Sequence, residues 1–404
     1  MKDFFSTVFS FNFFKVFVYF TFVFSGSIKW IPFPIDFTLF FGALCAAVLF
    51  FEIKTITIFR KEVYNQILLI LSLIVFFALS NFYTISYVYS DKKNEAMLLN
   101  FFTVIYPLLA FKDVIFKELQ KLMYLVGIFA VCMLAYVYFT TTFIIFFDET
   151  RYIENVPTYL TIGIMLSACF IFSLSSKPTI AVIIYRLILL FFLLQLGGRG
   201  PIFNLILSLC IYYVLNLKNI KFNYKVVLMF MAGIFVMIFY LDTIIGFIIE
   251  NVNIDRFNMV KASSEDVSVL YRVIVMEKGL QTFYEHPFMG LGIGSSGISL
   301  TGVDQVEFPH NLIIESLMEL GILGGILYLS IYIYFFVYHL KYIRKDKRLL
   351  IMYIIALLFF LEDMKSGSFD GWRISLFWIC IYIIEYNFKM NNKNTPPKQY
   401  LTKV

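Results

Sequence analysis

Charged residues are scarce in this sequence: Asp, Glu, Lys and Arg together make up 15% of its 404 residues. Soluble globular domains carry about 25% charged residues, so this chain has too little charge to cover a conventional polar surface. Its hydrophobic fraction of 60% also lies far from the low hydrophobicity of disordered chains. These features exclude a soluble enzyme and a disordered protein, and they indicate an all-α, polytopic integral membrane protein.

Motifs for disulfides, dinucleotides and nucleic acids are missing as well. The five cysteines lie in apolar runs, without a CxxC pair or a nearby histidine, so we expect them to be packing residues. Gly292, Gly294 and Gly297 spell GxGxxG, but no βαβ unit surrounds them, and we expect a flexible turn. The basic residues are dispersed, which argues against nucleic acid as a partner.

Long apolar runs dominate the chain. A hydrocarbon core about 30 Å thick needs about 20 apolar residues per helix, and on this basis we predict about twelve spans. Their ranges are 8–25, 36–53, 65–87, 96–111, 122–145, 159–176, 179–196, 201–217, 226–249, 310–340, 349–364 and 372–388. The predicted division is helices 1–9 in residues 1–249, an extracytoplasmic loop domain at 250–309, helices 10–12 in 310–388 and a tail at 389–404.

The distribution of Lys and Arg predicts the orientation. Placing the N-terminus inside puts most of the basic residues of short loops on the inner side, as the positive-inside rule requires. Both termini are therefore expected in the cytoplasm. The first apolar run has no small-residue cleavage site after it, so we expect it to be a retained span.

The predicted outer loop 250–309 is long enough to be functional. Apolar residues at helical spacing run from Val267 to Phe283, and Pro287 should end this helix. None of the outer loops contains a DxD, an HExxH or a His/Cys cluster with ligand spacing. We therefore expect no metal and no cofactor.

Two arginines on the predicted outer face are candidate anion ligands. Arg199 lies in the GGRGP stretch, where Pro201 suits the first turn of an inward-running helix. A helix N-terminus together with an arginine suits a phosphate group, although a turn with an interfacial arginine is the alternative. Arg272 lies in the loop helix with Ser268 and Gly279 near it; the alternative is an arginine that pairs with Glu265 or Glu277.

Two further helix starts carry polar candidates. His310 follows Pro309 and precedes Asn311 at the start of the tenth span, where the helix dipole favours a neutral imidazole that can accept a proton. A capping histidine without chemistry is the alternative. Arg373 opens the twelfth span in the same orientation. Three positive helix ends carrying Arg199, His310 and Arg373 predict an anion site facing away from the cytoplasm.

Three stretches resemble the superfamily of O-antigen polymerases and ligases (Wzy and WaaL). They are LGGRGP at 196–201, Tyr271-Arg272 followed by EHPFMGLGIG at 285–294, and FPHNLIIESLMELGILGG at 308–325. The order of the motifs and the large outer loop before the His-bearing helix match as well. The resemblance implies metal-independent glycosyl transfer from an undecaprenyl-diphosphate-linked glycan. By position, it implies that Arg199 and Arg272 neutralise the diphosphate and that His310 lies near the acceptor hydroxyl.

The remaining expectations follow from that reaction. Asn311, Glu307 and Arg373 are expected to contact substrate, and Glu307 and Asp304 are alternative bases.

The residues of the GGRGP and FPHN motifs resemble those of polymerases more than those of ligases. A polymerase uses another lipid-linked repeat unit as acceptor, whereas a ligase uses lipid A-core. A lipid-glycan exporter is a rival without clear internal repeats to support it. The expected location is a bacterial inner membrane with the site on the periplasmic face, and the expected partners are the lipid-linked oligosaccharide, membrane lipid and a chain-length regulator protein.

Overall fold

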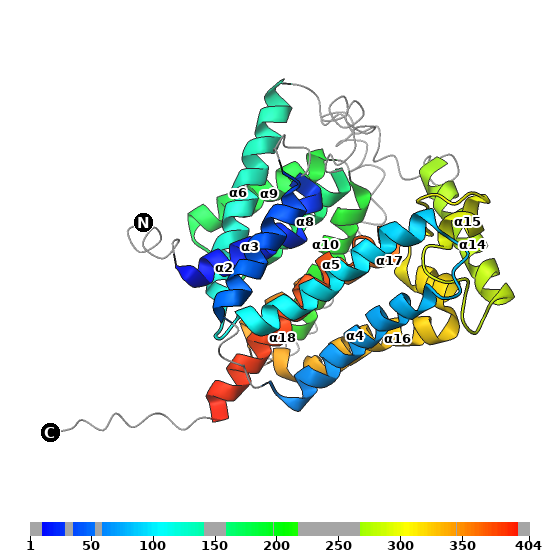
Figure 1. The fold of residues 1–404 in the computed structure, drawn as a ribbon. Helices are drawn as coiled ribbons and strands as arrows, with labels where there is room; N and C mark the ends of the chain where they lie inside the picture. Colours follow the sequence, from blue (N-terminus) through cyan, green and yellow to red (C-terminus); the bar gives the residue numbers. More distant parts are fainter. Residues whose placement is uncertain are drawn as a thin grey trace.

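The computed structural model describes residues 10–28, 35–52, 59–140, 159–196, 198–216, 267–344 and 346–394 (Figure 1). These residues form helices joined by turns, with no strand among them, so the predicted all-α class is confirmed for this part of the chain. The helices are α2 Phe11–Val23, η1 Ser25–Ile28, α3 Phe37–Glu52, α4 Lys61–Ser80, α5 Val88–Ala110, α6 Phe116–Thr140, α8 Tyr159–Ser173, α9 Ile180–Gln195, α10 Arg199–Asn216, α14 Val267–Glu285, α15 Ser296–Thr301, α16 Leu312–Ile343, α17 Lys347–Ser366 and α18 Arg373–Asn394.

Several of these helices suit a membrane. Within the described residues, α4, α6 and α16 are long and apolar enough to cross one, and α2, α3, α8, α9 and α10 are shorter apolar helices. Large apolar side chains such as Leu39, Phe50 and Leu187 are exposed on them, as expected of helices that face lipid. The chain is a helical membrane protein. The predicted ninth span, 226–249, and the first part of the predicted loop domain lie outside the described residues, and the count of twelve spans stays a prediction.

The bundle brings distant parts of the chain together. Helix α16 packs along α4, and α17 packs against α10 and α18 (Figure 1). One end of the bundle holds the starts of α4, α17 and the end of α18: Arg60 N donates to Asn387 Oδ1 at 3.0 Å, and Lys389 pairs with Asp346. Several of the basic residues predicted to be cytoplasmic therefore share one end. The other end carries α14, α15 and the starts of α10 and α16, and which end faces the cytoplasm stays a prediction.

Helix α16 is interrupted at Gly321, whose backbone has φ 66° and ψ −160°. A side chain here would overlap the backbone of Phe288, so glycine is required both for the positive φ and for the close approach. The free backbone groups at the break are bonded to the segment 287–292. These bonds are Ile322 N to Pro287 O (2.7 Å), Leu291 N to Met318 O (3.0 Å) and Gly292 N to Glu319 O (2.9 Å).

The glycine-rich segment is a packed turn. Gly292 and Gly294 have φ of 87° and 75°, and they lie against the backbones of Thr84 and Ser90. Thr84 Oγ1 also donates to Ile293 O at 2.6 Å. The turn is thus enclosed between α16 and the α4–α5 connection, in contrast to the flexible turn expected from the sequence. It holds the loop helix α14 against the start of α16.

Candidate functional site

His310 lies in a distinctive backbone position. It is the one described residue other than glycine with a positive φ, 56°. The ring packs edge-on against Phe308, with centroids 4.6 Å apart, and lies 6.5 Å from the ring of Tyr271 on α14. Left-handed conformations in non-glycine residues are uncommon and concentrate at functional sites. The conformation and the two aromatic rings fix the direction of the imidazole.

The surroundings of His310 favour its neutral form. Burial lowers the pKa of the imidazole from its ordinary value of 6.5, Arg272 lowers it further, and Glu307 acts in the opposite direction. Arg272 directly follows Tyr271, whose ring lies 6.5 Å from the imidazole, so the histidine and the arginine of the two separate motifs lie near each other. A neutral imidazole can accept a proton at neutral pH.

Asn311 has a structural task. Its side-chain oxygen accepts from Ile313 N at 3.0 Å and Ile314 N at 3.2 Å, which makes it the N-cap of α16. Its amide nitrogen donates to Met364 O at 2.9 Å and so ties the start of α16 to the last part of α17. Both polar groups of the side chain are therefore engaged within the protein, although contact with substrate was expected of this residue.

Arg272 belongs to a polar group shared by α10, α14 and α17. It interacts electrostatically with Glu362 and with Lys365. Asn204 on α10 donates to Glu362 Oε2 at 2.7 Å. The Lys365 ammonium lies directly over Gly200, where any side chain would overlap it. The start of α10, the loop helix and the end of α17 thus meet at one place.

Arg199 is the first residue of α10, as its motif predicted. The position of its side chain lies outside what the structure describes. Its neighbour Gly200 contacts Lys365, so the helix start that carries Arg199 borders the polar group around Arg272. The structure therefore brings together two of the three stretches that carry the family resemblance at this point, and His310 adds the third.

Arg373 opens α18 as predicted, but its guanidinium faces other elements. It lies against Gly26 of η1 and interacts with Asp36 just before α3. None of its described contacts is with Arg272 or His310. Among the described contacts, Arg373 therefore does not join the residues around His310 and Arg272, and the convergence of three helix starts on one anion site stays a prediction.

The two alternative bases differ in their surroundings. Burial raises the pKa of Tyr271, and Glu307 raises it further and also acts to raise the pKa of His310, so Glu307 lies beside the candidate base. Asp304 instead caps the start of α5: it accepts from Ser86 Oγ at 2.7 Å, Tyr87 N at 2.7 Å and Val88 N at 2.9 Å. Although its slight burial acts to raise the pKa of Asp304, these hydrogen bonds lower it to about 2. Asp304 is therefore a weak base that anchors the loop.

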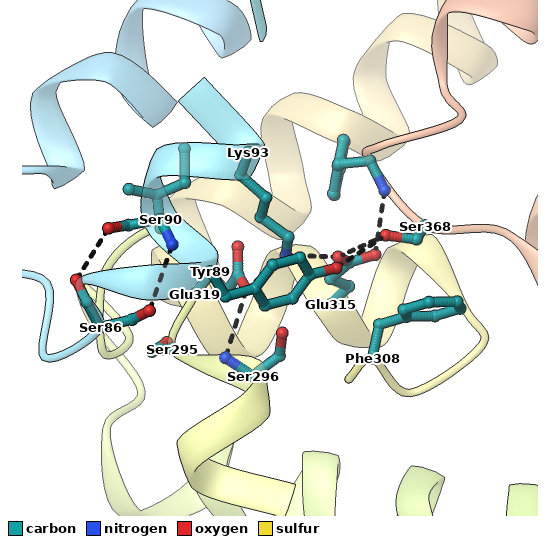
Figure 2. Close-up of polar contacts among 12 residues, drawn as sticks. Ser86, Tyr89, Ser90, Lys93, Ser295, Ser296, Phe308, Glu315, Glu319 and Ser368 are labelled. Atoms are coloured by element: carbon teal, nitrogen blue, oxygen red, sulfur yellow. Dashed lines mark hydrogen bonds and ion pairs between the residues drawn. The ribbon is translucent and has the colours of Figure 1, made fainter. Parts of the chain in front are cut away.

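A fully buried ionic cluster lies behind the start of α16 (Figure 2). Lys93 on α5 donates to Glu315 Oε1 and Glu319 Oε1, both at 2.5 Å, and the side chains of all three residues are 0% exposed. Ser368 Oγ and Phe369 N, between α17 and α18, donate to Glu315 at 3.0 and 3.2 Å. The cluster ties α5, α16 and the α17–α18 connection together one turn after His310.

Sequence reasoning missed this cluster and the proximity of Glu362 and Lys365 to Arg272. Two acidic residues four positions apart in an apolar run, as in Glu315 and Glu319, share one helix face. Ionisable residues inside a membrane span are costly and are functional candidates, so this spacing was an available signal. No local signal identified Lys93 as the partner, because the pairing depends on which helices are neighbours.

The comparison with protein families agrees with the motifs. Residues 184–329 match the model of the family described as O-antigen ligase. The matched range contains Arg199, Arg272 and His310 together with the glycine-rich turn. No curated protein matches the chain. The match confirms, over residues 184–329, the resemblance of this chain to the superfamily of O-antigen ligases and polymerases, whose members are glycosyltransferase-like enzymes.

Proposed function

We propose that this protein is an O-antigen polymerase that transfers a glycan from undecaprenyl diphosphate to a sugar hydroxyl of another lipid-linked repeat unit. The observation that carries the proposal is the proximity of the half-buried, neutral His310 to Tyr271 and Arg272 at the loop helix. The imidazole can accept a proton and the guanidinium can bind a phosphate group, and the two residues come from different motifs. The site would face the periplasm of a bacterial inner membrane, with both termini in the cytoplasm and a chain-length regulator as a candidate partner.

The reaction needs one bond made and one broken. The acceptor oxygen forms the new bond to the anomeric carbon of the donor. The bond from that carbon to the diphosphate oxygen breaks, and its electron pair stays on the departing lipid diphosphate. Arg199 and Arg272 neutralise this charge as it develops, while His310 takes the hydroxyl proton. Glu307, beside His310, supports the resulting imidazolium.

A ligase is the second candidate, because the description of the matched family is O-antigen ligase. Polymerase and ligase share the donor and differ in the acceptor. Purified protein should therefore be given one lipid-linked oligosaccharide alone and, separately, the same donor with a lipid A-core acceptor. Elongation of the oligosaccharide supports the polymerase, and transfer only to lipid A-core supports the ligase. Transport into liposomes without transfer supports the exporter and overturns both.

We expect elongation to survive chelation by EDTA. The outer loops lack metal-ligand motifs, and the proposed leaving-group stabilisation relies on arginines. The rate of elongation with EDTA should equal the rate in untreated protein. A rate that falls with EDTA and returns on addition of a divalent metal contradicts the arginine-based scheme.

Arg272→Ala should lower the rate of elongation by about 10²–10³-fold, the usual loss when one donor to a developing negative charge is removed. Arg199→Lys should also lose most activity, because lysine keeps the charge but not the planar fork that binds two phosphate oxygens. Arg344→Gln is the matched control, since Arg344 is an exposed cation at the opposite end of the bundle. Normal elongation by both site variants would place the diphosphate elsewhere.

A further inference from the structure

Lys365 occupies an electrostatically unfavourable place. Its ammonium lies over Gly200 in the first turn of α10, where the unpaired N–H groups of a helix carry a partial positive charge. Arg272 lies near enough to interact with it as a like charge. Two full positive charges and a positive helix end therefore meet within one small region, at the site proposed for the donor diphosphate.

One carboxylate among the described residues interacts with both of these cations. Glu362 lies three positions before Lys365, on the same face of α17, and interacts with Lys365 and Arg272. Asn204 Nδ2 donates to its Oε2 at 2.7 Å. Glu362 is half-buried, so its attraction to the cations is screened less than it would be at an open surface. Its single charge leaves the group with a net positive charge.

We infer that Lys365 is a third phosphate-binding cation of the donor site and that Glu362 competes with the diphosphate for Lys365 and Arg272. This inference rests on the proposed function and adds two residues to its site. A diphosphate carries more negative charge than one carboxylate and offers more acceptor oxygens, so it displaces Glu362 from the cations. After transfer, the carboxylate returns to them and promotes release of the lipid diphosphate.

The position of the Lys365 ammonium explains why residue 200 is a glycine. The α10 motif places a residue without a side chain where the Lys365 ammonium crosses the helix start. With alanine at this position, the methyl group would occupy the place of the ammonium and push Lys365 away. The residue after Arg199 in the motif therefore makes room for a cation contributed from another helix.

Binding of undecaprenyl diphosphate to the purified full-length protein tests the inference without requiring transfer. Lys365→Gln should weaken binding by about 10–100-fold, the equivalent of one charge-assisted hydrogen bond. Glu362→Gln should tighten binding by about 3–10-fold, because it keeps an acceptor for Asn204 but removes the competing charge. Gly200→Ala should weaken binding as Lys365→Gln does, and the two changes together should add little to either one.

Two controls separate charge from damage to the fold. Lys365→Arg keeps a cation and should keep binding within a few-fold, whereas Arg344→Gln removes an exposed cation at the opposite end and should leave binding unchanged. Undecaprenyl monophosphate serves as the second probe and should show a smaller effect of Lys365→Gln than the diphosphate does. Equal affinities of the wild type, Lys365→Gln and Glu362→Gln for the diphosphate, in protein that still elongates glycans, would overturn the inference alone. Absence of both diphosphate binding and transfer in the wild type would overturn the proposed function with it.

Discussion

Replacing His310 with alanine should slow glycan transfer by about 10²–10⁴-fold, the usual contribution of a general base. Binding of the undecaprenyl-diphosphate donor should persist, because the proposed diphosphate ligands, Arg199 and Arg272, remain in place. The measurement is the single-turnover rate of elongation at saturating donor, together with the donor dissociation constant. A loss of donor binding equal to the loss of rate would show that His310 holds the donor.

Glutamine at position 310 separates a base from an orienting group. The amide can form a hydrogen bond, but it cannot take a proton near neutral pH. Equal, large losses in His310→Gln and His310→Ala support the base. A small loss with glutamine and a large loss with alanine would mean that His310 orients the acceptor hydroxyl. Near-normal rates in both variants would make Glu307, which lies beside the imidazole, the base to test.

The pH dependence of the rate follows from the surroundings of His310. Burial, reinforced by Arg272, lowers the pKa of the imidazole below 6.5. The neutral form is the active one and it persists above that pKa, so the acid limb of kcat/KM should have its midpoint below 6.5. Glu307→Gln removes the group that raises this pKa and should move the midpoint lower still. A midpoint above 6.5 in the wild type would contradict a half-buried, neutral base.

The positions of helices and of helix starts could be predicted from the sequence. Apart from 226–249, which lies outside the described residues, every range predicted as a span contains a helix. Arg199 and His310 do lie at helix starts. Hydropathy and helix capping depend on residues within one segment, so both can be recognised from the sequence.

Contacts between helices were much harder to predict. Arg373 has the same kind of helix start as Arg199, yet it faces Gly26 and Asp36, because α18 packs beside other neighbours. The position of Lys365 over Gly200 likewise depends on the packing of α17 against α10. Side-chain partners across a bundle are fixed by tertiary packing, which no single segment encodes.

Lys93→Met should lower the free energy of unfolding by about 3–5 kcal/mol, the usual cost of breaking a buried ion pair. Methionine fills a similar space, but it leaves the two carboxylates of Glu315 and Glu319 buried without their cation. One oxygen of Glu319 already has no hydrogen-bond partner among the described residues, and removing the ammonium leaves the other with Ser296 N at 3.4 Å. The measurement is resistance to thermal unfolding in detergent. The control is Lys92→Met: Lys92 is the exposed neighbour of Lys93, and its replacement should change the free energy of unfolding by no more than about 0.5 kcal/mol.

A triple variant tests whether buried charge is the cause. Adding Glu315→Gln and Glu319→Gln to Lys93→Met removes the uncompensated carboxylates and should restore much of the lost stability, because replacing a whole buried ionic group is far less costly than breaking it. Glu315 also accepts from Ser368 and from Phe369 N, and a glutamine oxygen can retain one of these bonds. Rescue of stability together with partial rescue of transfer would show that the cluster positions the start of α16, and hence His310. Stability of Lys93→Met equal to that of Lys92→Met would remove the cluster from the forces that hold this end of the bundle together.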